Sequence, residues 1–464
     1  MNIEEWQIYA ARIEQLAADQ GLKYHPVEFE IVPENFMTEI AIYGLPVRMP
    51  HWSFGARYIY QLIQHRMGLS RLFEVVYPGN PGRAYLAKSN SIAENVLVTA
   101  HVLGHADFSA NNLLFRRSQA EVGEHIVEQA AAHARRISQA IQDHGIEAVE
   151  TVLDAALALE QHVDIHQGLR REKYPERMPD RAPPAVDEFS QRYALLGPDT
   201  ARPRISTGPA KRTPTPPHPE QDLLWFIAQY APDLEPWERD IFLAVREESF
   251  YFYPVFACQI MNEGWASYWH ARLLREADFL PQSCYVDAIK CHSDVVRPTA
   301  GSEQVALSTN PYHLGFSIWE KIIEQQGLEQ ARRIMSEDDD FSFVRNHLTL
   351  ELATELELFR YEGPANGTLV VQDVDLPALH EALLSPKYGF GAPTVSAAHV
   401  HLDGRLDLLH DHVADGRGLD PERSRKVLEY IVRVWRRPVT LATVDGNEHG
   451  MEITVSPSLQ LESG

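Results

Sequence analysis

A proline-rich stretch separates two long segments with helical periodicity, and it limits how the chain can fold. Between Pro175 and Pro219, 11 of the chain's 30 prolines fall within 45 residues, alternating with charged and small residues. Proline lacks the backbone N–H and its ring clashes with the preceding turn, so such a stretch cannot pack as regular helix. We therefore predict that residues 175–222 form a linker or a long surface loop.

The segments on either side of this stretch predict a helical core. Apolar residues recur at intervals of three and four in SIAENVLVTAHVLGHADFSANNLLF, and again in PVFACQIMNEGWASYWHARLLRE, where Pro254 would be the first helical residue. We predict a mainly helical part over residues 1–174 and a helical part over residues 223–365, packed together as one core.

Residues 366–464 have a different pattern, which is typical of a small α+β domain. Segments such as AHVHLDGRLDLLHDH and RPVTLATVDG indicate strands with turns at Asp403-Gly404 and Asp445-Gly446, and PERSRKVLEYIVRVWRR is expected to be a helix. The predicted fold class is therefore α+β, with a predominantly helical core and this small C-terminal α+β domain.

The acidic composition limits the possible partners. The chain has 42 lysines and arginines against 65 aspartates and glutamates, a formal net charge of −23, whereas a nucleic-acid binder needs a cationic surface. The amino terminus lacks the basic start and apolar core of a signal peptide, and no uncharged apolar run approaches the ~20 residues of a membrane span. We therefore expect a cytoplasmic protein with no nucleic-acid partner and no membrane span.

Two histidines stand one helical turn apart in the first helical part. His101 and His105 are four residues apart, so on a helix both imidazoles lie on one face and can reach one metal ion. Glu94, seven residues before His101, falls on nearly the same face. The apolar neighbours Val102 and Leu103 indicate a buried helix, whose polar residues need partners. Ordinary helices often carry histidines at this spacing, and the apolar neighbours strengthen the interpretation as a metal site.

The second helical part offers a carboxylate and another imidazole. Glu263 and His270 are seven residues apart and therefore lie on one helical face. Gly264 would let another helix or a ligand approach closely, and the hydroxyl of Tyr268 would donate a hydrogen bond. Glu263 is the predicted third metal ligand beside the two histidines.

This set of residues is similar to the zinc site of zincins, with one difference. In a zincin, two histidines on one helix and a glutamate on a following helix hold zinc and leave a fourth position for the attacking water. The general-base glutamate that directly follows the first zincin histidine is replaced here by Val102. A hydrolase would need another base, and the candidates are Glu94, Asp107, Glu248 and His270.

Two other segments carry polar residues that suit a site. His162 and His166 repeat the one-turn spacing with Asp164 between them, which would fit a second metal or a proton relay, but the pattern more often marks a helix end with exposed polar residues. Asn310 and Tyr312 stand where a loop leads into a helix, so they would either cap that helix or orient a ligand.

Four motifs follow one another along the chain: MPHWSFGARY, HVLGHADFSANN, VREESFYFYPVFACQIMNEGWASYWH and NPYHLGF. Together they resemble the SpoVR family, named for stage V sporulation protein R, over essentially the whole chain. The resemblance implies a role in forming the spore cortex, a peptidoglycan layer, or in a broader stress or envelope response. It also implies two partners, a serine-kinase-like AAA+ protein and a von Willebrand-type domain protein.

The sequence therefore leads to three hypotheses. In the first, the chain is a zinc-dependent hydrolase of amide bonds in cell-wall-type peptides, and its metal ligands are His101, His105 and Glu263. Protons and the developing oxyanion would be handled by Glu94, Tyr268 and His270. In the second, the chain is a regulator or scaffold of the AAA+ kinase system, with a structural metal or a polar core. In the third, the same ligands hold iron or manganese for redox chemistry.

Overall fold

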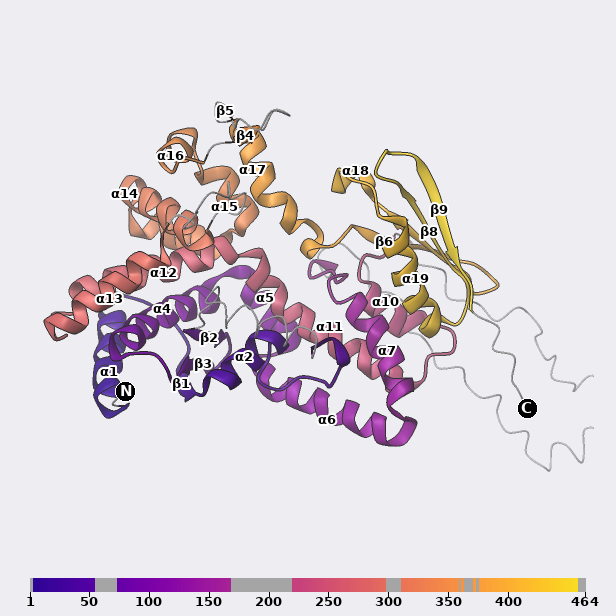
Figure 1. The fold of residues 1–464 in the computed structure, drawn as a ribbon, viewed down its shortest axis with the longest axis horizontal. Coiled ribbons are helices and arrows are strands. Elements are labelled where there is room, and N and C mark those ends of the chain that lie inside the picture. The colour runs from indigo at the N-terminus through magenta and orange to yellow at the C-terminus, as the bar shows by residue number, and fades with distance from the viewer. Residues whose placement is uncertain are drawn as a thin grey trace, which may run out of the picture.

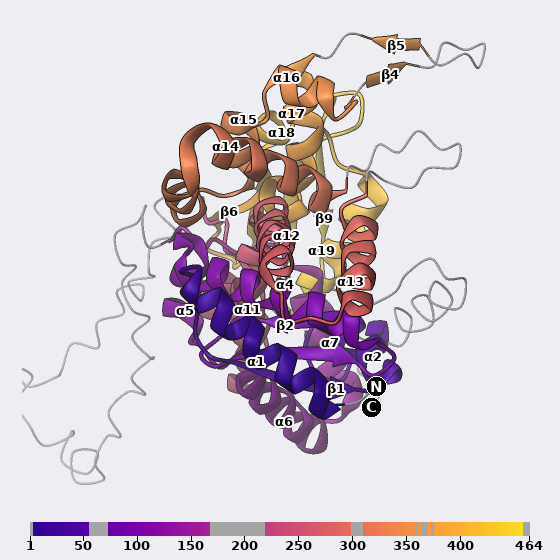
Figure 2. The same cartoon turned by 90° about the vertical axis from the view of Figure 1, so that its left-hand side faces the viewer.

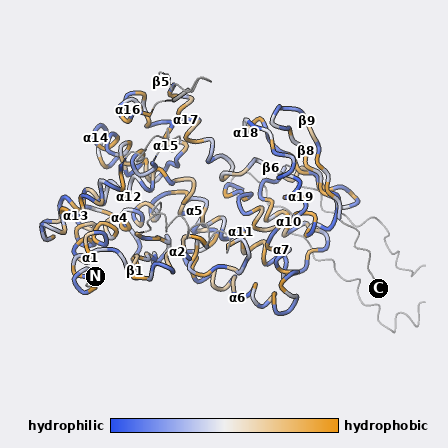
Figure 3. Tube along the Cα trace, in the orientation of Figure 1, coloured by the Kyte–Doolittle hydropathy of each residue, from blue (hydrophilic) through white to orange (hydrophobic). Residues whose placement is uncertain are grey.

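Helices make up most of the structure. The computed structural model describes residues 3–54, 73–167, 219–297, 310–358, 360–362, 370–372 and 375–457 (Figure 1). Hydrophobic and hydrophilic residues are interleaved along the helices (Figure 3), because most of them turn one apolar face toward a core and a polar face toward solvent. Nearly all of the predicted linker over residues 175–222 lies outside the described residues.

The chain begins with a helix and a small mixed sheet. α1 (Ile3–Asp19) is followed by β1 (Val27–Val32), α2 (Glu34–Tyr43), β2 (Glu74–Tyr77) and β3 (Gly82–Ala87). β1 runs parallel to β3 and β2 runs antiparallel to it, so β3 is the central strand. This sheet was not predicted from the sequence, although VEFEIV in β1 alternates apolar and acidic residues as a strand does.

Two groups of helices form the body of the molecule, in the segments whose periodicity predicted helices. The first group comprises α4 (Ile92–Asn111), α5 (Leu113–Val122), α6 (Ile126–His144) and α7 (Ile146–Ala158). The second comprises α10 (Leu223–Tyr230), α11 (Pro236–Ala257), α12 (Gln259–Glu276), α13 (Gln282–Val295), α14 (Pro311–Glu337), α15 (Asp340–His347) and α16 (Leu350–Glu355). α14 breaks at Gly327, where φ is +83°.

Glycines allow α4, α12 and α14 to pack closely. A Cβ atom added to Gly104 of α4 would lie 2.6 Å from Ala266 Cα of α12. One added to Gly264 of α12 would lie 2.2 Å from the carbonyl carbon of Gly315 in α14. These distances leave no room for a side chain, so glycine is required at both contacts. Figures 1 and 2 show α4 and α12 side by side, and this contact positions the candidate site.

Pro254 lies inside α11, so the prediction that it begins the next helix was wrong. α11 continues past Pro254 to Ala257, and α12 begins two residues later. A proline inside a helix deprives the carbonyl four residues earlier of its N–H partner. That carbonyl belongs to Phe250, and it accepts a hydrogen bond of 2.7 Å from Ser118 Oγ on α5 instead. The neighbouring helix thus supplies the donor that the proline lacks.

Buried apolar residues form two large cores. The first lies among α1, α4, α12 and α14 and contains Trp265, Trp269 and Trp319. The second joins α7, α10 and α11 to strands and a helix of the C-terminal region, and contains Trp435. The second core therefore draws on both helical groups and on the C-terminal region. The division of the chain at residues 174, 222 and 365 stays a prediction.

The C-terminal region contains the larger sheet. Its strands β6 (Val395–Val400), β7 (Leu406–His410), β8 (Val439–Val444) and β9 (Gly450–Val455) pair in that order, and α18 (His412–Asp415) and α19 (Pro421–Trp435) lie between β7 and β8 in the chain. The predicted turns at Asp403-Gly404 and Asp445-Gly446 connect β6 to β7 and β8 to β9. Figure 1 shows this sheet at the end of the molecule opposite α1 and α13.

Shorter elements connect α16 to this sheet. β4 (Arg360–Glu362) pairs with β5 (Val370–Gln372), followed by α17 (Leu376–Leu384) and a 3-10 segment (Ser385–Gly391). A mostly helical structure with a small C-terminal sheet domain confirms the α+β class. Within the described part of the chain, no helix combines the length and the apolar composition that crossing a bilayer requires.

Candidate metal centre

The helix α4 holds two buried histidines on the side that faces α12. It begins with a capping box in which Ser91 Oγ accepts from Glu94 N and Glu94 Oε2 accepts from Ser91 N, so the first turn is fixed at both residues. His101 and His105 follow on the same helix and are only 2% and 9% exposed. Their rings lie edge to face with centroids 4.5 Å apart.

Glu263 of α12 lies opposite both histidines. Its Oε2 is 3.6 Å from His101 Nε2 and 3.4 Å from His105 Nε2. One possible ligand atom from each residue lies within 4.8 Å of the other two. We call His101, His105 and Glu263 the His–Glu cluster. Among the described residues it is the one group of three such side chains with this spacing.

Two atoms of the His–Glu cluster are buried without a hydrogen bond. His101 Nε2 and Glu263 Oε2 are shielded from solvent, and neither has a hydrogen-bond partner among the described residues. Leaving a buried polar group unpaired costs about 1–3 kcal/mol. Imidazole nitrogens and a carboxylate oxygen that face one point are the donors that zinc, iron and manganese bind. The side chains present therefore fit a divalent metal ion.

In each histidine of the cluster, Nε2 faces Glu263 and Nδ1 contacts a further buried side chain. His105 Nδ1 lies 2.9 Å from Asn262 Oδ1. Because an amide oxygen only accepts, Nδ1 of His105 donates and Nε2 faces Glu263. His101 Nδ1 lies 2.9 Å from His270 Nδ1, and His270 Nε2 lies 2.6 Å from His292 Nδ1. These contacts orient both imidazoles toward the carboxylate, as is common for metal-ligating histidines.

The three side chains of the cluster shift one another's pKa values. Burial, followed by the charge of His105, lowers the pKa of His101 to about 4. Burial also opposes a charge on His105, but the Glu263 carboxylate outweighs it and raises the His105 pKa. Burial would raise the pKa of Glu263, and the histidines reverse this and hold it far below its usual value. The carboxylate and a lone pair on His101 are therefore both present at neutral pH.

A cavity of about 290 Å³ opens beside His101. Tyr312, in the first turn of α14, lines this cavity, and its ring stacks on the His101 ring with centroids 6.0 Å apart. The Glu263 charge, followed by burial, raises the Tyr312 pKa well above its usual value. The phenol therefore keeps its proton, and its hydroxyl is a hydrogen-bond donor near the Glu263 carboxylate.

Glu74, the first residue of β2, lines the same cavity. Burial raises the pKa of its carboxyl to about 7, with the His105 charge opposing and the Glu263 charge adding to the shift. A carboxyl with a pKa near 7 is suited to act as a general base. Glu74 was missed in the sequence, where the only signal is one acidic residue in the apolar segment FEVVY.

The three residues predicted to handle protons lie in different places. His270 is in contact with His101, behind the cluster. Glu94 lines the cavity, and its carboxylate also caps α4. Tyr268 accepts a hydrogen bond of 3.2 Å from Arg272 Nη1 and packs edge-on against Trp269. The structure does not bring Tyr268 into the His–Glu cluster, and its predicted part in catalysis stays untested.

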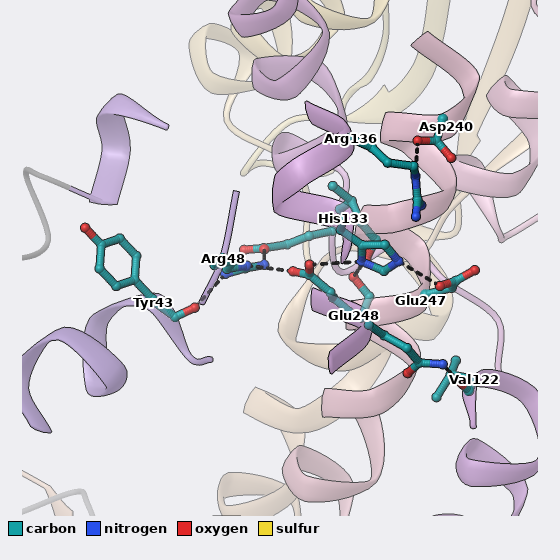
Figure 4. Close-up of polar contacts among 12 residues, drawn as sticks. Tyr43, Arg48, Val122, His133, Arg136, Asp240, Glu247 and Glu248 are labelled. Carbon is teal, nitrogen blue, oxygen red and sulfur yellow. Dashed lines mark hydrogen bonds and ion pairs between the residues drawn. The ribbon is translucent and has the colours of Figure 1, made fainter. Parts of the chain in front are cut away.

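Two further candidates for the general base are engaged elsewhere. Asp107 accepts hydrogen bonds of 2.7 Å from the backbone of Lys23 and 2.9 Å from Trp265 Nε1. Glu248 is completely buried and contacts Arg48 Nε at 2.7 Å and His133 Nδ1 at 3.4 Å (Figure 4). Neither carboxylate lines the cavity beside His101.

The second histidine pair does not form a three-ligand group with other described side chains. His162, Asp164 and His166 line a different cavity, of about 230 Å³, together with Tyr253 and Phe390. Asp164 Oδ1 accepts a hydrogen bond of 2.9 Å from the backbone of His166, which is the arrangement of a polar turn after a helix. A second metal site is therefore not supported here.

Comparisons with known proteins agree with the motifs. The model of the family described as SpoVR like protein matches residues 1–383, so it ends before the four-stranded sheet. The "Uncharacterized protein YcgB" of Escherichia coli strain K12 is 27% identical over 479 aligned positions, which cover 94% of this chain and 91% of that protein. No solved structure matches. Because the family model covers most of the chain, and the motifs that carry the His–Glu cluster lie within it, the chain belongs to the SpoVR family.

Proposed function

We propose that the chain is a zinc-dependent hydrolase of amide bonds. One observation carries this proposal: His101 Nε2 and Glu263 Oε2 are buried, make no hydrogen bond and lie 3.6 Å apart beside a cavity. Their cost in free energy is removed if both bind a cation. Two histidines and a glutamate are also a common set of protein ligands in zinc hydrolases.

The residues around the cluster supply the other parts of a hydrolytic site. A zinc ion held by the His–Glu cluster would polarise the amide carbonyl and acidify a water molecule. Glu74 would take up a proton from water and pass it to the leaving amine, the part that the glutamate at the position of Val102 plays in zincins. His270 keeps the His101 ring oriented. Tyr312, whose neutral phenol lies near Glu263, would stabilise the charge of that carboxylate.

The family suggests where such an activity would act. The proposed substrates are cell-wall-type peptides, in the form of precursors or recycled fragments within the cytoplasm. The serine-kinase-like AAA+ protein and the von Willebrand-type domain protein are proposed partners that would regulate the activity. These assignments rest on the SpoVR resemblance. The described residues add that both histidines of the cluster are buried and that the cavity beside them has a volume of about 290 Å³.

The ligand set also favours a second candidate function. Two histidines and one carboxylate that leave coordination positions open are the set used by non-haem iron(II) enzymes. An iron or manganese redox protein would use the same three residues. A regulator with a purely structural metal would instead need a closed set of four ligands, and the His–Glu cluster supplies three.

Metal analysis of the purified chain tests the proposal. We expect one zinc per chain by elemental analysis, lost in His101→Ala and in Glu263→Gln, and retained in His125→Ala, whose exposed histidine lies outside the site. Stoichiometric iron or manganese would support the redox alternative, and a folded chain without metal would refute both. The hydrolase itself requires release of new amines from peptidoglycan-derived peptides, and this release should be lost in Glu74→Gln while zinc is kept.

A further inference from the structure

The two edges of the four-stranded sheet differ in how they are covered. The edge strands are β6 and β9. β6 contains a bulge between Ala397 and His399, and Glu220 pairs with Ala397 through backbone hydrogen bonds of 2.9 and 2.7 Å. β9 pairs with β8 in a continuous register without a bulge, and no other strand of the described chain pairs with it (Figure 1). Bulges and covering segments are common protections of sheet edges, so β6 is protected in two ways that β9 is not.

The backbone of β9 presents hydrogen-bonding groups on the side away from β8. The turn before β9 closes with a hydrogen bond of 2.9 Å from Asp445 N to His449 O. Hydrogen-bonded pairs recur at every second residue of an antiparallel ladder, so the odd-numbered residues of β9 bind β8. The hydroxyls of Thr440 and Thr454 lie 3.0 Å apart, as expected for a pair without backbone hydrogen bonds. The backbone groups of Glu452 and Thr454 therefore point outward, and none of them is bonded to another described residue.

The sequence of β9 does not prevent another strand from pairing there. Its six residues, Gly450–Val455, include neither lysine nor proline, the residues that most often block an edge. Glu452 carries the one charge, and its side chain is exposed. An extended strand can therefore add to β9 through main-chain hydrogen bonds.

We propose that a second copy of this chain pairs with β9, antiparallel to it and related by a twofold axis at Ile453. In this register Glu452 lies opposite Thr454 of the second copy, and Met451 lies opposite Val455. Each charged residue then faces an uncharged one, and apolar residues face each other. A register centred on Glu452 would place two carboxylates opposite each other, which is destabilising. The strand is thus complementary to itself, and the inference does not depend on the proposed metal site.

The joined sheets would share one apolar layer. Ile453 is buried in the second core, and Met451 and Val455 pack against it from the same face of β9. α19 packs on β8 and β9, so the twofold axis would bring both copies of α19 to one face of an eight-stranded sheet. Each pair of Glu452 with Thr454 exchanges two backbone hydrogen bonds. Such an interface is small, so we expect association in about the micromolar range.

Sedimentation equilibrium of the full chain tests the inference. Measurements from about 1 to 300 µM, in about 0.15 M salt to screen the repulsion between two acidic chains, should show a monomer–dimer equilibrium. Glu452→Pro removes one outward N–H, leaves the bonds to β8 in place and should abolish the dimer. A chain that stays monomeric over this range would overturn the inference and leave the edge to a strand of a different protein.

Two variants of the exposed Thr454 test the register. Thr454→Glu would put a second carboxylate opposite Glu452 of the other copy and should raise the dimer Kd about fivefold, whereas Thr454→Lys should lower it about fivefold. Gln142→Glu and Gln142→Lys are the matched controls, because Gln142 is exposed on α6, and they should leave the Kd unchanged. A dimer that responds equally to the two Thr454 variants, or that persists in Glu452→Pro, would show that the copies do not pair through β9.

Discussion

His101 Nδ1 and His270 Nδ1 lie 2.9 Å apart inside the protein, and His270 Nε2 lies 2.6 Å from Nδ1 of His292. Each contact joins two imidazole nitrogens, so one of them must carry the proton and the other must accept it. If His101 donates to His270 and His270 donates to His292, every ring is neutral and His101 Nε2 keeps its lone pair. Burial lowers the pKa of His270 and of His292, which agrees with neutral rings.

Replacing His270 should therefore weaken the metal site without removing a ligand. In His270→Leu, His101 loses the acceptor that fixes its tautomer and its ring orientation. We expect zinc affinity to fall about 10- to 100-fold, measured by competition with a fluorescent zinc chelator. His125→Leu, a change at an exposed histidine, should keep the affinity of the original chain. Equal affinities in the two variants would show that His270 does not support His101.

Local spacing was enough to predict part of this site. His101 and His105 are one turn apart, and any helix over this segment places them on one face. The choice of Glu263 depended on a second helix with the same periodicity, and the structure places its carboxylate opposite both histidines. The α+β class followed in the same way from repeats of three, four and two residues.

Contacts between distant segments could not be predicted. Glu74 reaches the cavity from a sheet whose strands are short, and its position depends on how that sheet packs against α4. His292 meets His270 because α13 packs beside α12 and α4. The place of Pro254 inside α11 depends on Ser118, which is 132 residues away from the carbonyl that it binds. Such pairings follow from tertiary packing, and a single sequence carries no local signal for them.

The contact between α12 and α14 should not tolerate a methyl group. In Gly264→Ala the new Cβ would lie 2.2 Å from the carbonyl carbon of Gly315, so the two helices must separate. We expect a loss of about 3 kcal/mol or more in the free energy of unfolding, measured by urea denaturation. Gly446→Ala is the control, because a Cβ there meets open space, and it should change this energy by less than about 1 kcal/mol. A stable Gly264→Ala chain would contradict the observed packing.

His133 should make the stability depend on pH. Its Nε2 lies 3.0 Å from Glu247 and its Nδ1 lies 3.4 Å from Glu248 (Figure 4). Burial opposes a charge on this ring, but the hydrogen bonds to the two glutamates outweigh it and raise the His133 pKa to about 9. Because this pKa lies above the unfolded value of about 6.5, the stabilisation is complete below pH ~6.5 and is lost as the pH rises through about 9.

The variant His133→Gln isolates this contribution. The difference in unfolding free energy between the original chain and the variant should shrink by at most about 3 kcal/mol between pH 6 and pH 9.5. Guanidinium chloride would screen the charges, so urea is the denaturant of choice. A difference that stays constant over this range would mean that His133 is not charged in the folded protein.

Asp340 of α15 should determine how firmly α12 is held. Its two carboxylate oxygens accept hydrogen bonds of 2.9 Å from the backbone of Ile260 and Met261, in the first turn of α12, and Lys387 Nζ lies 3.1 Å from Oδ2. Asp340 is completely buried and Lys387 is nearly so. Asp340→Asn leaves the lysine charge unpaired, which should cost about 3–5 kcal/mol.

The double variant Asp340→Asn with Lys387→Met distinguishes loss of the charge pair from loss of the helix cap. If the unpaired lysine causes most of the cost, the double variant should recover much of the stability measured by urea denaturation. If the backbone hydrogen bonds matter more, it should stay as unstable as Asp340→Asn.

Glu263 lies two residues after Met261, so a looser start of α12 also displaces a proposed metal ligand. Zinc affinity should therefore fall in both variants, and unchanged affinity would show that the contact between α4 and α12 alone positions Glu263.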